Sequence, residues 1–237
     1  MSCAFRLSAR QSVALLWPLL LMLSPQASGA EDLDYSYVEV GYAVDSTAEA
    51  YGQTYDSDSS FRVQASYLLN SHLLFSAQMY TGGYDIAVHE EYHLTGYSLG
   101  VGYRGRISDK KAMPVDWFVS LSYEHNITQS QVGKVNSRTG RNGGGLRVGI
   151  RAAVTDNFEV GFEAYERAFG TDFLRRNGDL DALSFELGAA LELNDHISLT
   201  AAYRTGELDY KFLDNFPKKY EIELDQDEVI VGVRVSY

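Results

Sequence analysis

The amino-acid sequence predicts an all-β fold: an antiparallel, up-and-down transmembrane β-barrel of ten strands, with eight strands as the alternative. Apolar and polar residues alternate with a period of two in one segment after another, which indicates strands with two different environments. No segment beyond residue 30 approaches the ~20 consecutive apolar residues that a membrane-spanning helix needs. The connections are alternately short and long, which is typical of barrels that cross a membrane.

The clearest alternating segment is the last nine residues of the chain. One face contains Ile230, Gly232, Arg234 and Ser236, and the last residue of the segment is an aromatic. The opposite, apolar face consists of Val229, Val231, Val233, Val235 and Tyr237.

Nine further segments alternate in the same way. A strand tilted by ~45° needs about 9–11 residues to cross the hydrocarbon of a bilayer, and most of these segments reach that length. They span residues 35–44, 61–69, 73–84, 92–104, 116–126, 146–154, 158–163, 183–193 and 197–204.

The connections predict which end of the barrel carries loops. Tight turns are expected at residues 70–72, 155–157 and 194–196, because Asn, Asp and Ser favour turns. Residues 107–115 should form the fourth short connection, although they are longer. An even number of strands places both termini at this end. Long polar loops are expected at the other end, over residues 45–60, 85–91, 127–142, 170–180 and 207–227.

The N-terminus predicts a secretory signal peptide at residues 1–30, followed by one barrel domain at residues 31–237. Arg6 and Arg10 precede an apolar run at residues 12–23, and small residues lead to a cleavage site after Ala30. Cys3 is the single cysteine and is removed with the signal peptide, so we expect no disulfide in the mature chain.

The pattern as a whole resembles the small outer-membrane β-barrels of bacteria, the class that includes the OmpA- and OmpX-like proteins. The resemblance covers nearly all of the chain after the signal peptide. It implies a Gram-negative outer-membrane location, with membrane lipids and lipopolysaccharide as neighbours. In that class the last strand is the signal read by the barrel-assembly machinery, and here Val233, Val235 and Tyr237 correspond to it.

The formal net charge of −12 argues against a nucleic-acid partner, because nucleic-acid binding needs a basic surface. We expect a monomer without a cofactor.

Charged residues occur repeatedly on the polar face of the predicted strands, which should face the barrel interior. An interior of eight to ten strands is narrow enough for side chains to fill, and buried charges there must be paired. The favoured interpretation is therefore a closed, charge-filled interior, and the alternative is a narrow path for small solutes. The residues concerned are Glu39, Arg62, Glu124, Arg147, Arg151, Glu159, Glu163, Glu186, Glu192, Arg204 and Arg234.

One motif suggests a metal site but lies in the wrong context. His89, Glu90 and His93 match the H-E-x-x-H pattern, in which a helix brings two histidines to one zinc ion. Here the motif lies between two alternating segments, and in an extended strand residues four apart are roughly 13 Å from each other. A solvated acidic loop is the favoured interpretation, with weak metal binding as the alternative.

The expected function is non-enzymatic: a structural or surface-interacting barrel. A narrow pore is the second hypothesis. A hydrolase at the outer rim, acting on lipid A or peptides, is the third, although no nucleophile and base are spaced so as to indicate one.

Overall fold

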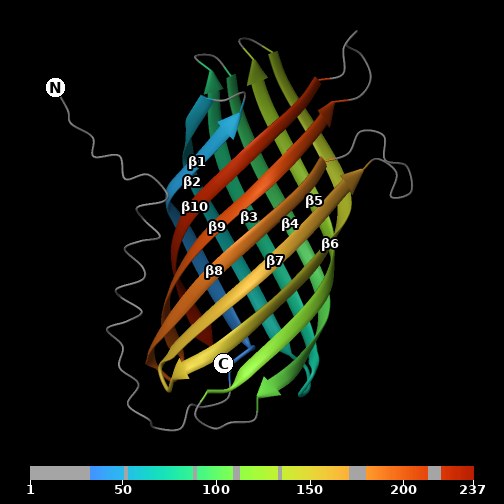
Figure 1. The fold of residues 1–237 in the computed structure, drawn as a ribbon. Helices are drawn as coiled ribbons and strands as arrows, with labels where there is room; N and C mark the ends of the chain where they lie inside the picture. Colours follow the sequence, from blue (N-terminus) through green and yellow to red (C-terminus); the bar gives the residue numbers. More distant parts are fainter. Residues whose placement is uncertain are drawn as a thin grey trace, which may run out of the picture.

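The computed structural model describes residues 33–50, 53–87, 90–108, 113–132, 135–170, 180–212 and 220–237, which form one closed antiparallel barrel (Figure 1). The prediction of ten strands is confirmed, and the alternative of eight is wrong. The strands are β1 (Tyr37–Ala50), β2 (Gln53–Leu68), β3 (Leu73–Ala87), β4 (Glu90–Ser108), β5 (Val115–Val132), β6 (Val135–Thr155), β7 (Phe158–Gly170), β8 (Leu180–Asn194), β9 (Ile197–Phe212) and β10 (Tyr220–Ser236).

Each strand pairs with its neighbours in the sequence, and β1 pairs with β10 to close the ring. The register sets Tyr37 opposite Ser236, so the described chain starts and ends at the same end of the barrel. We call this the short-turn end and the opposite one the hairpin end; Figure 1 shows the C-terminus at the short-turn end. No helix among the described residues is long and apolar enough to span a membrane.

The alternation in the sequence divides the barrel wall into an apolar outer face and a polar inner face. Outward residues such as Leu187 and Val231 keep 50% and 43% of their surface exposed, whereas inward Glu39 and Arg62 are buried. An exposed apolar band of this kind is what lipid-facing barrel walls present.

Asparagine side chains close two of the tight turns, as their composition predicts. Asn70 Oδ1 accepts hydrogen bonds from the backbone N–H groups of His72 and Leu73, at 2.9 and 2.8 Å. Asn194 Oδ1 accepts the equivalent pair from His196 and Ile197, both at 3.0 Å. These Asx turns replace the backbone partners that the turn residues lack.

The expectation of long irregular loops at the hairpin end is wrong for most of them. Residues 45–60 are β-strand up to Ala50 and again from Gln53, and residues 127–142 are strand up to Val132 and again from Val135. In β2, β5 and β6 the strands continue beyond the apolar band, where both faces are mostly polar and the alternation in hydropathy that identified them disappears. In β10 the alternation persists, with Tyr220, Ile222 and Leu224 separated by acidic residues, and could have been extended to find this part of the strand. Residues 171–179 and 213–219, within two other predicted loops, lie outside the described residues.

One glycine is required by a close approach inside the wall. A Cβ atom at Gly96 on β4 would overlap the ring of Tyr80, its register partner on β3. The missing side chain therefore lets the Tyr80 ring lie against the wall instead of projecting across the interior.

Arginine on the outer face should destabilise the barrel. We expect Val231→Arg and Leu187→Arg each to reduce the free energy of unfolding by about 2–4 kcal/mol, because a cation at mid-membrane depth loses its hydration. Urea titration of the folded protein in lipid vesicles measures this. The control is Glu49→Arg, on an exposed outward position of the β1–β2 hairpin, which should have little effect. Near-wild-type stability of both apolar-face variants would show that this face does not contact lipid.

Candidate functional site

The candidate functional site is the charged interior of the barrel. Because side chains of a strand alternate between its two faces, every second residue of each strand enters the confined lumen. The inward residues include Glu124, Glu39, Arg62 and Arg151, which keep 1%, 5%, 6% and 8% of their surface exposed. Charges buried to this degree require oppositely charged partners.

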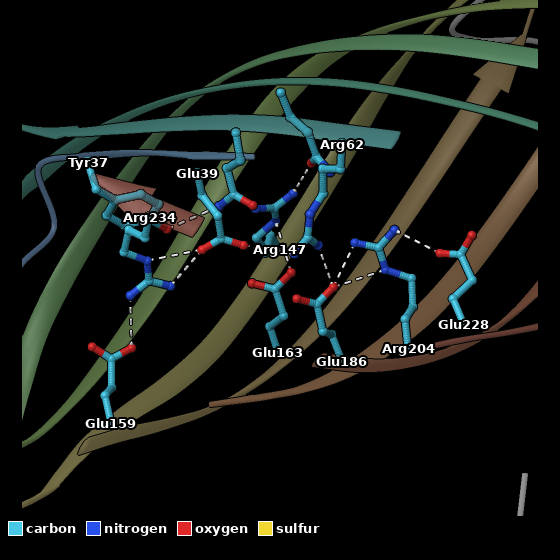
Figure 2. A network of polar contacts seen from close by, with 12 residues as sticks. Tyr37, Glu39, Arg62, Arg147, Glu159, Glu163, Glu186, Arg204, Glu228 and Arg234 are labelled. Atoms are coloured by element: carbon cyan, nitrogen blue, oxygen red, sulfur yellow. Dashed lines mark hydrogen bonds and ion pairs between the residues drawn. The ribbon is translucent and has the colours of Figure 1, made fainter. Parts of the chain in front are cut away.

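Eight of these side chains form one continuous chain of ion pairs in which arginine and glutamate alternate; we call it the Arg/Glu chain. Figure 2 shows it from Glu159 onward. Because it has four arginines and four glutamates, its formal charges cancel. In order, its members are Arg151, Glu159, Arg234, Glu39, Arg62, Glu186, Arg204 and Glu228.

The first half of the Arg/Glu chain lies toward the short-turn end. Arg151 on β6 donates two hydrogen bonds to the carboxylate of Glu159 on β7, at 2.8 and 2.5 Å. Glu159 also contacts Arg234 Nη1 at 3.4 Å, and Arg234 binds Glu39 Oε2 at 3.0 Å. The planar guanidinium groups suit such two-point contacts.

The second half continues toward the hairpin end. Arg62 binds Glu39 at 3.2 Å and Glu186 at 2.7 Å. Arg204 then binds Glu186 at 2.6 Å and Glu228 at 3.5 Å. Glu186 therefore accepts from two guanidinium groups, and removal of its charge would leave both without their shortest ion pair.

Two links of the chain cross the lumen rather than joining neighbouring strands. Arg62 stands on β2 and Glu186 on β8, with β1, β10 and β9 between them in the ring. Arg234 on β10 likewise reaches Glu159 on β7, past β9 and β8. The chain thus spans the inside of the barrel instead of only lining it.

A second group of side chains fills the wall beside this chain. Arg147 contacts Glu163 at 3.8 Å, donates to Gln78 Oε1 at 2.6 Å, and lies over the ring of Tyr165 at 4.4 Å. The Tyr165 hydroxyl in turn donates to Glu124. Arg147 therefore draws side chains of β3 and β7 toward its own strand, β6.

Two carboxylates lie next to each other in this region. Glu163 and Glu186 are register partners on β7 and β8. Each carboxylate has its own arginine, Arg147 for Glu163 and Arg62 for Glu186, which offsets their mutual repulsion.

A third group at the short-turn end was not predicted. Asp116 is fully buried and pairs with Arg104 at 3.0 Å and Arg106 at 3.1 Å. The ring of Tyr35, just before β1, lies under Arg104 at 4.9 Å and Arg151 at 4.3 Å. Burial raises the pKa of the Tyr35 phenol to about 12, so it stays neutral at physiological pH. This group covers the interior from the short-turn end.

The structure brings together ten of the eleven charged residues predicted for the interior. Glu192 differs, because it is exposed close to the turn between β8 and β9. Asp116, Arg104, Glu228 and Arg167 are also inward-facing but were missed. Arg104 and Asp116 lie at the ends of predicted strands, and Arg167 and Glu228 lie just outside them. The parity of the alternation could have been extended to find all four.

Two cavities remain between these side chains. The larger, of about 110 Å³, lies on the short-turn side and is lined by Tyr37, Glu39 and Arg234, among others. The smaller, of about 50 Å³, lies on the hairpin side and is lined by Tyr80 and Arg167, among others. We call them the inner cavity and the outer cavity. Arg62 lines both, so the Arg62–Glu186 ion pair stands at the boundary between them.

The H-E-x-x-H motif has no helical geometry in the described part of the chain. Glu90 and His93 belong to β4, where His93 is exposed and pairs in register with Gly83 and Gln129. His89 lies outside the described residues. Among the residues that the structure describes, no three His, Cys, Asp or Glu side chains are grouped as metal ligands.

The C-terminal residues lie on the outer face of β10. Val233, Val235 and Tyr237 keep 43%, 47% and 66% of their surface exposed, and the Tyr237 ring stacks on Tyr67 with a centroid distance of 6.5 Å.

A closed antiparallel barrel with an apolar outer band, paired charges inside and short turns at one end defines the class of transmembrane β-barrel proteins. Residues 14–184 match the family described as outer membrane protein beta-barrel domain, and the chain belongs to this family. Its location is therefore the bacterial outer membrane.

Comparison with solved structures gives similar barrels at low sequence identity. Neisserial surface protein A is 16% identical with a TM-score of 0.45, covering 85% of this chain and 96% of its own. Ail of Yersinia pestis is 12% identical with a TM-score of 0.39, covering 86% and 99%. The outer-membrane protease OmpT of Escherichia coli is 9% identical with a TM-score of 0.48, covering 87% and 99%. None of these likenesses bears on function, and no curated protein matches the chain.

Neutralising the shared carboxylate of the Arg/Glu chain should destabilise the barrel. We expect Glu186→Gln to lower the free energy of unfolding by about 3–5 kcal/mol, because Arg62 and Arg204 lose a buried counter-charge. Glu192→Gln makes the same chemical change at an exposed position and should stay within about 0.5 kcal/mol of wild type. Urea titration in vesicles compares the two, and equal losses would contradict a special role for the buried carboxylate.

Proposed function

We propose that this protein is a non-enzymatic barrel whose interior is closed by the Arg/Glu chain, with a structural or surface-interacting role in the outer membrane. The observation that carries this proposal is the Arg62–Glu186 ion pair of 2.7 Å between nearly opposite walls. A lumen crossed by paired side chains, with cavities of about 110 and 50 Å³ on the two sides of Arg62, leaves little room for hydrated solutes to pass.

A narrow pore is the second candidate function, and the position of the two cavities is the observation that favours it. The inner and outer cavities lie on opposite sides of Arg62. Exchange of the Arg62 guanidinium between Glu39 and Glu186, both already within 3.2 Å, would change the barrier between the cavities without unfolding a strand. In that case the same residues would act as a gate.

Planar-bilayer recording separates the two functions. For a closed interior, we expect wild-type protein to insert without discrete current steps. The double variant Arg62→Ala/Glu186→Ala should show steps, because it removes both side chains at the boundary between the cavities. Glu192→Gln serves as the control and should remain silent. Reproducible steps from the wild-type protein would contradict the closed interior and support the pore.

We also propose that the chain carries no catalytic site. The extended backbone at Glu90 and His93 supports this, because strand spacing holds residues four apart too far from each other to share a zinc ion. A hydrolytic activity on lipid A or peptides that is lost in Glu90→Ala and His93→Ala would contradict the proposal and favour a rim hydrolase.

Export and assembly form a further part of the proposal. We propose that residues 1–30, which lie outside the described residues, are removed during export, which the mass of the purified protein would show. Lipopolysaccharide and membrane lipids would surround the monomeric barrel, and the barrel-assembly machinery would read the outward side chains of Val233, Val235 and Tyr237.

Loss of the terminal aromatic should therefore slow assembly in cells. We expect Tyr237→Ala to reduce the amount of heat-modifiable, folded protein in outer membranes several-fold, while refolding of the purified chain into detergent changes little. Tyr67→Ala removes the ring that Tyr237 stacks on and is the matched control for packing alone. A similar loss in both variants would attribute the effect to packing rather than to recognition.

A further inference from the structure

We propose that the outer cavity binds a small anion, with Arg167 as its cationic contact. The cavity has a volume of about 50 Å³ and lies within the barrel on the hairpin side of Arg62. Space of this size holds about three or four water molecules, or one anion of the size of chloride or of a phosphate group. The inference does not depend on whether the barrel is closed or acts as a narrow pore, because it concerns only the outer half of the interior.

Arg167 differs from the arginines of the Arg/Glu chain in the nature of its partners. Each of those guanidinium groups contacts at least one carboxylate, but Arg167 forms no ion pair with any residue in the described part of the chain. Its guanidinium group instead lies over the rings of Tyr80 and Tyr165, at 5.3 and 5.2 Å from their centroids. Aromatic faces attract the cation but do not neutralise it.

The two tyrosine rings fix Arg167 because glycines make room for them. The Tyr80 ring lies against Gly96, and a Cβ atom at Gly145 would come within 2.8 Å of the Tyr165 ring. Tyr165 is further held by its hydrogen bond to Glu124. The wall thus holds a guanidinium group in a set position beside the cavity. The buried carboxylate of Glu124 acts on it electrostatically but forms no ion pair with it.

Buried hydrogen-bond donors without acceptors are grouped around the same cavity. The Nε atoms of Arg167 and Arg62 and the Nε2 atom of Gln226 are buried and have no hydrogen-bond partner. All three residues line the outer cavity. Asn126 Oδ1, a buried acceptor that also lines the cavity, likewise has no partner among the described residues. Buried polar groups are almost always satisfied in folded proteins, so an acceptor for the three N–H donors is expected inside this cavity.

The remaining charged groups at the cavity leave room for an anion. Arg62, Arg167 and Arg204 supply positive charge, and Glu207 and Glu228 supply negative charge. Glu228 is engaged with the Ser60 hydroxyl at 3.0 Å and with Arg204 at 3.5 Å, and Glu207 is exposed. An anion beside Arg167 would accept from the three donors and would also supply the ion-pair partner that no described carboxylate gives this guanidinium group, whereas water would bring no charge.

Crystallography with bromide tests the proposal directly. The protein is extracted from outer membranes in detergent and crystallised in sodium bromide, and anomalous diffraction locates the ion. We expect a bromide peak in contact with the Arg167 guanidinium group of the wild type and no peak there in Arg167→Met. Arg138→Met removes an exposed, outward arginine of the β6 hairpin and should retain the peak.

A thermal measurement gives an independent readout. The midpoint of heat unfolding of the wild type should rise by about 2–4 °C more than that of Arg167→Met when bromide is raised from about 10 to about 500 mM, because ligand binding stabilises the folded state. Repeating the titration with sodium phosphate tests the larger anion. Arg138→Met should respond as the wild type does.

Three results would overturn the proposal: density for water alone with no anomalous peak in the wild type, a peak that persists in Arg167→Met, or equal thermal responses of these two proteins. If Arg167→Met does not fold, Gln226→Met removes a second donor at the same cavity and should lower the bromide occupancy. The wild-type crystal decides the question in either case.

Discussion

The pairing of β1 with β10 is the contact on which the remaining structure depends. It closes the sheet, so no edge strand presents unpaired backbone groups to hydrocarbon. Closure also decides which residues enter the lumen, because every inward position now faces other side chains instead of open water. The charged residues that the sequence places there must then find partners inside a narrow tube, and the Arg/Glu chain is the arrangement that results.

The Arg/Glu chain contributes to the fold as much by fixing the geometry of the strands as by its interaction energy. A buried ion pair is not intrinsically stronger than a well-packed apolar contact, since both ions lose their hydration. Each link nevertheless requires its two strands to be in the correct register, because a shift by one residue would turn the arginine or glutamate toward lipid. Links such as Arg234–Glu159 and Arg62–Glu186 impose this requirement between strands that share no backbone hydrogen bonds.

The alternation of side chains allowed the strand number, the topology and most of the buried charges to be predicted from sequence. The prediction failed where the two faces of a strand do not differ in polarity. In β2 and β6 both faces are mostly polar beyond the apolar band, so Gln53 and Val135 fall within predicted loops although they begin strands. The partners of each charge were also beyond prediction, because the distance from Arg62 to Glu186 depends on the width of the barrel and on the register of five strands.

The same extension of the strands sets how far the barrel projects beyond the bilayer. β5 has 18 residues, which at ~3.3 Å per residue and a tilt of ~45° rise about 40 Å, against an apolar band of about 25 Å. The hydrogen-bonded β5–β6 hairpin therefore continues well beyond the apolar band, with strand pairing up to Val132 and Val135. Exposed positions of this hairpin, such as Arg138, are separated along the barrel axis from the Arg/Glu chain, so the sequence there can vary without disturbing the contacts that hold the membrane-spanning part together.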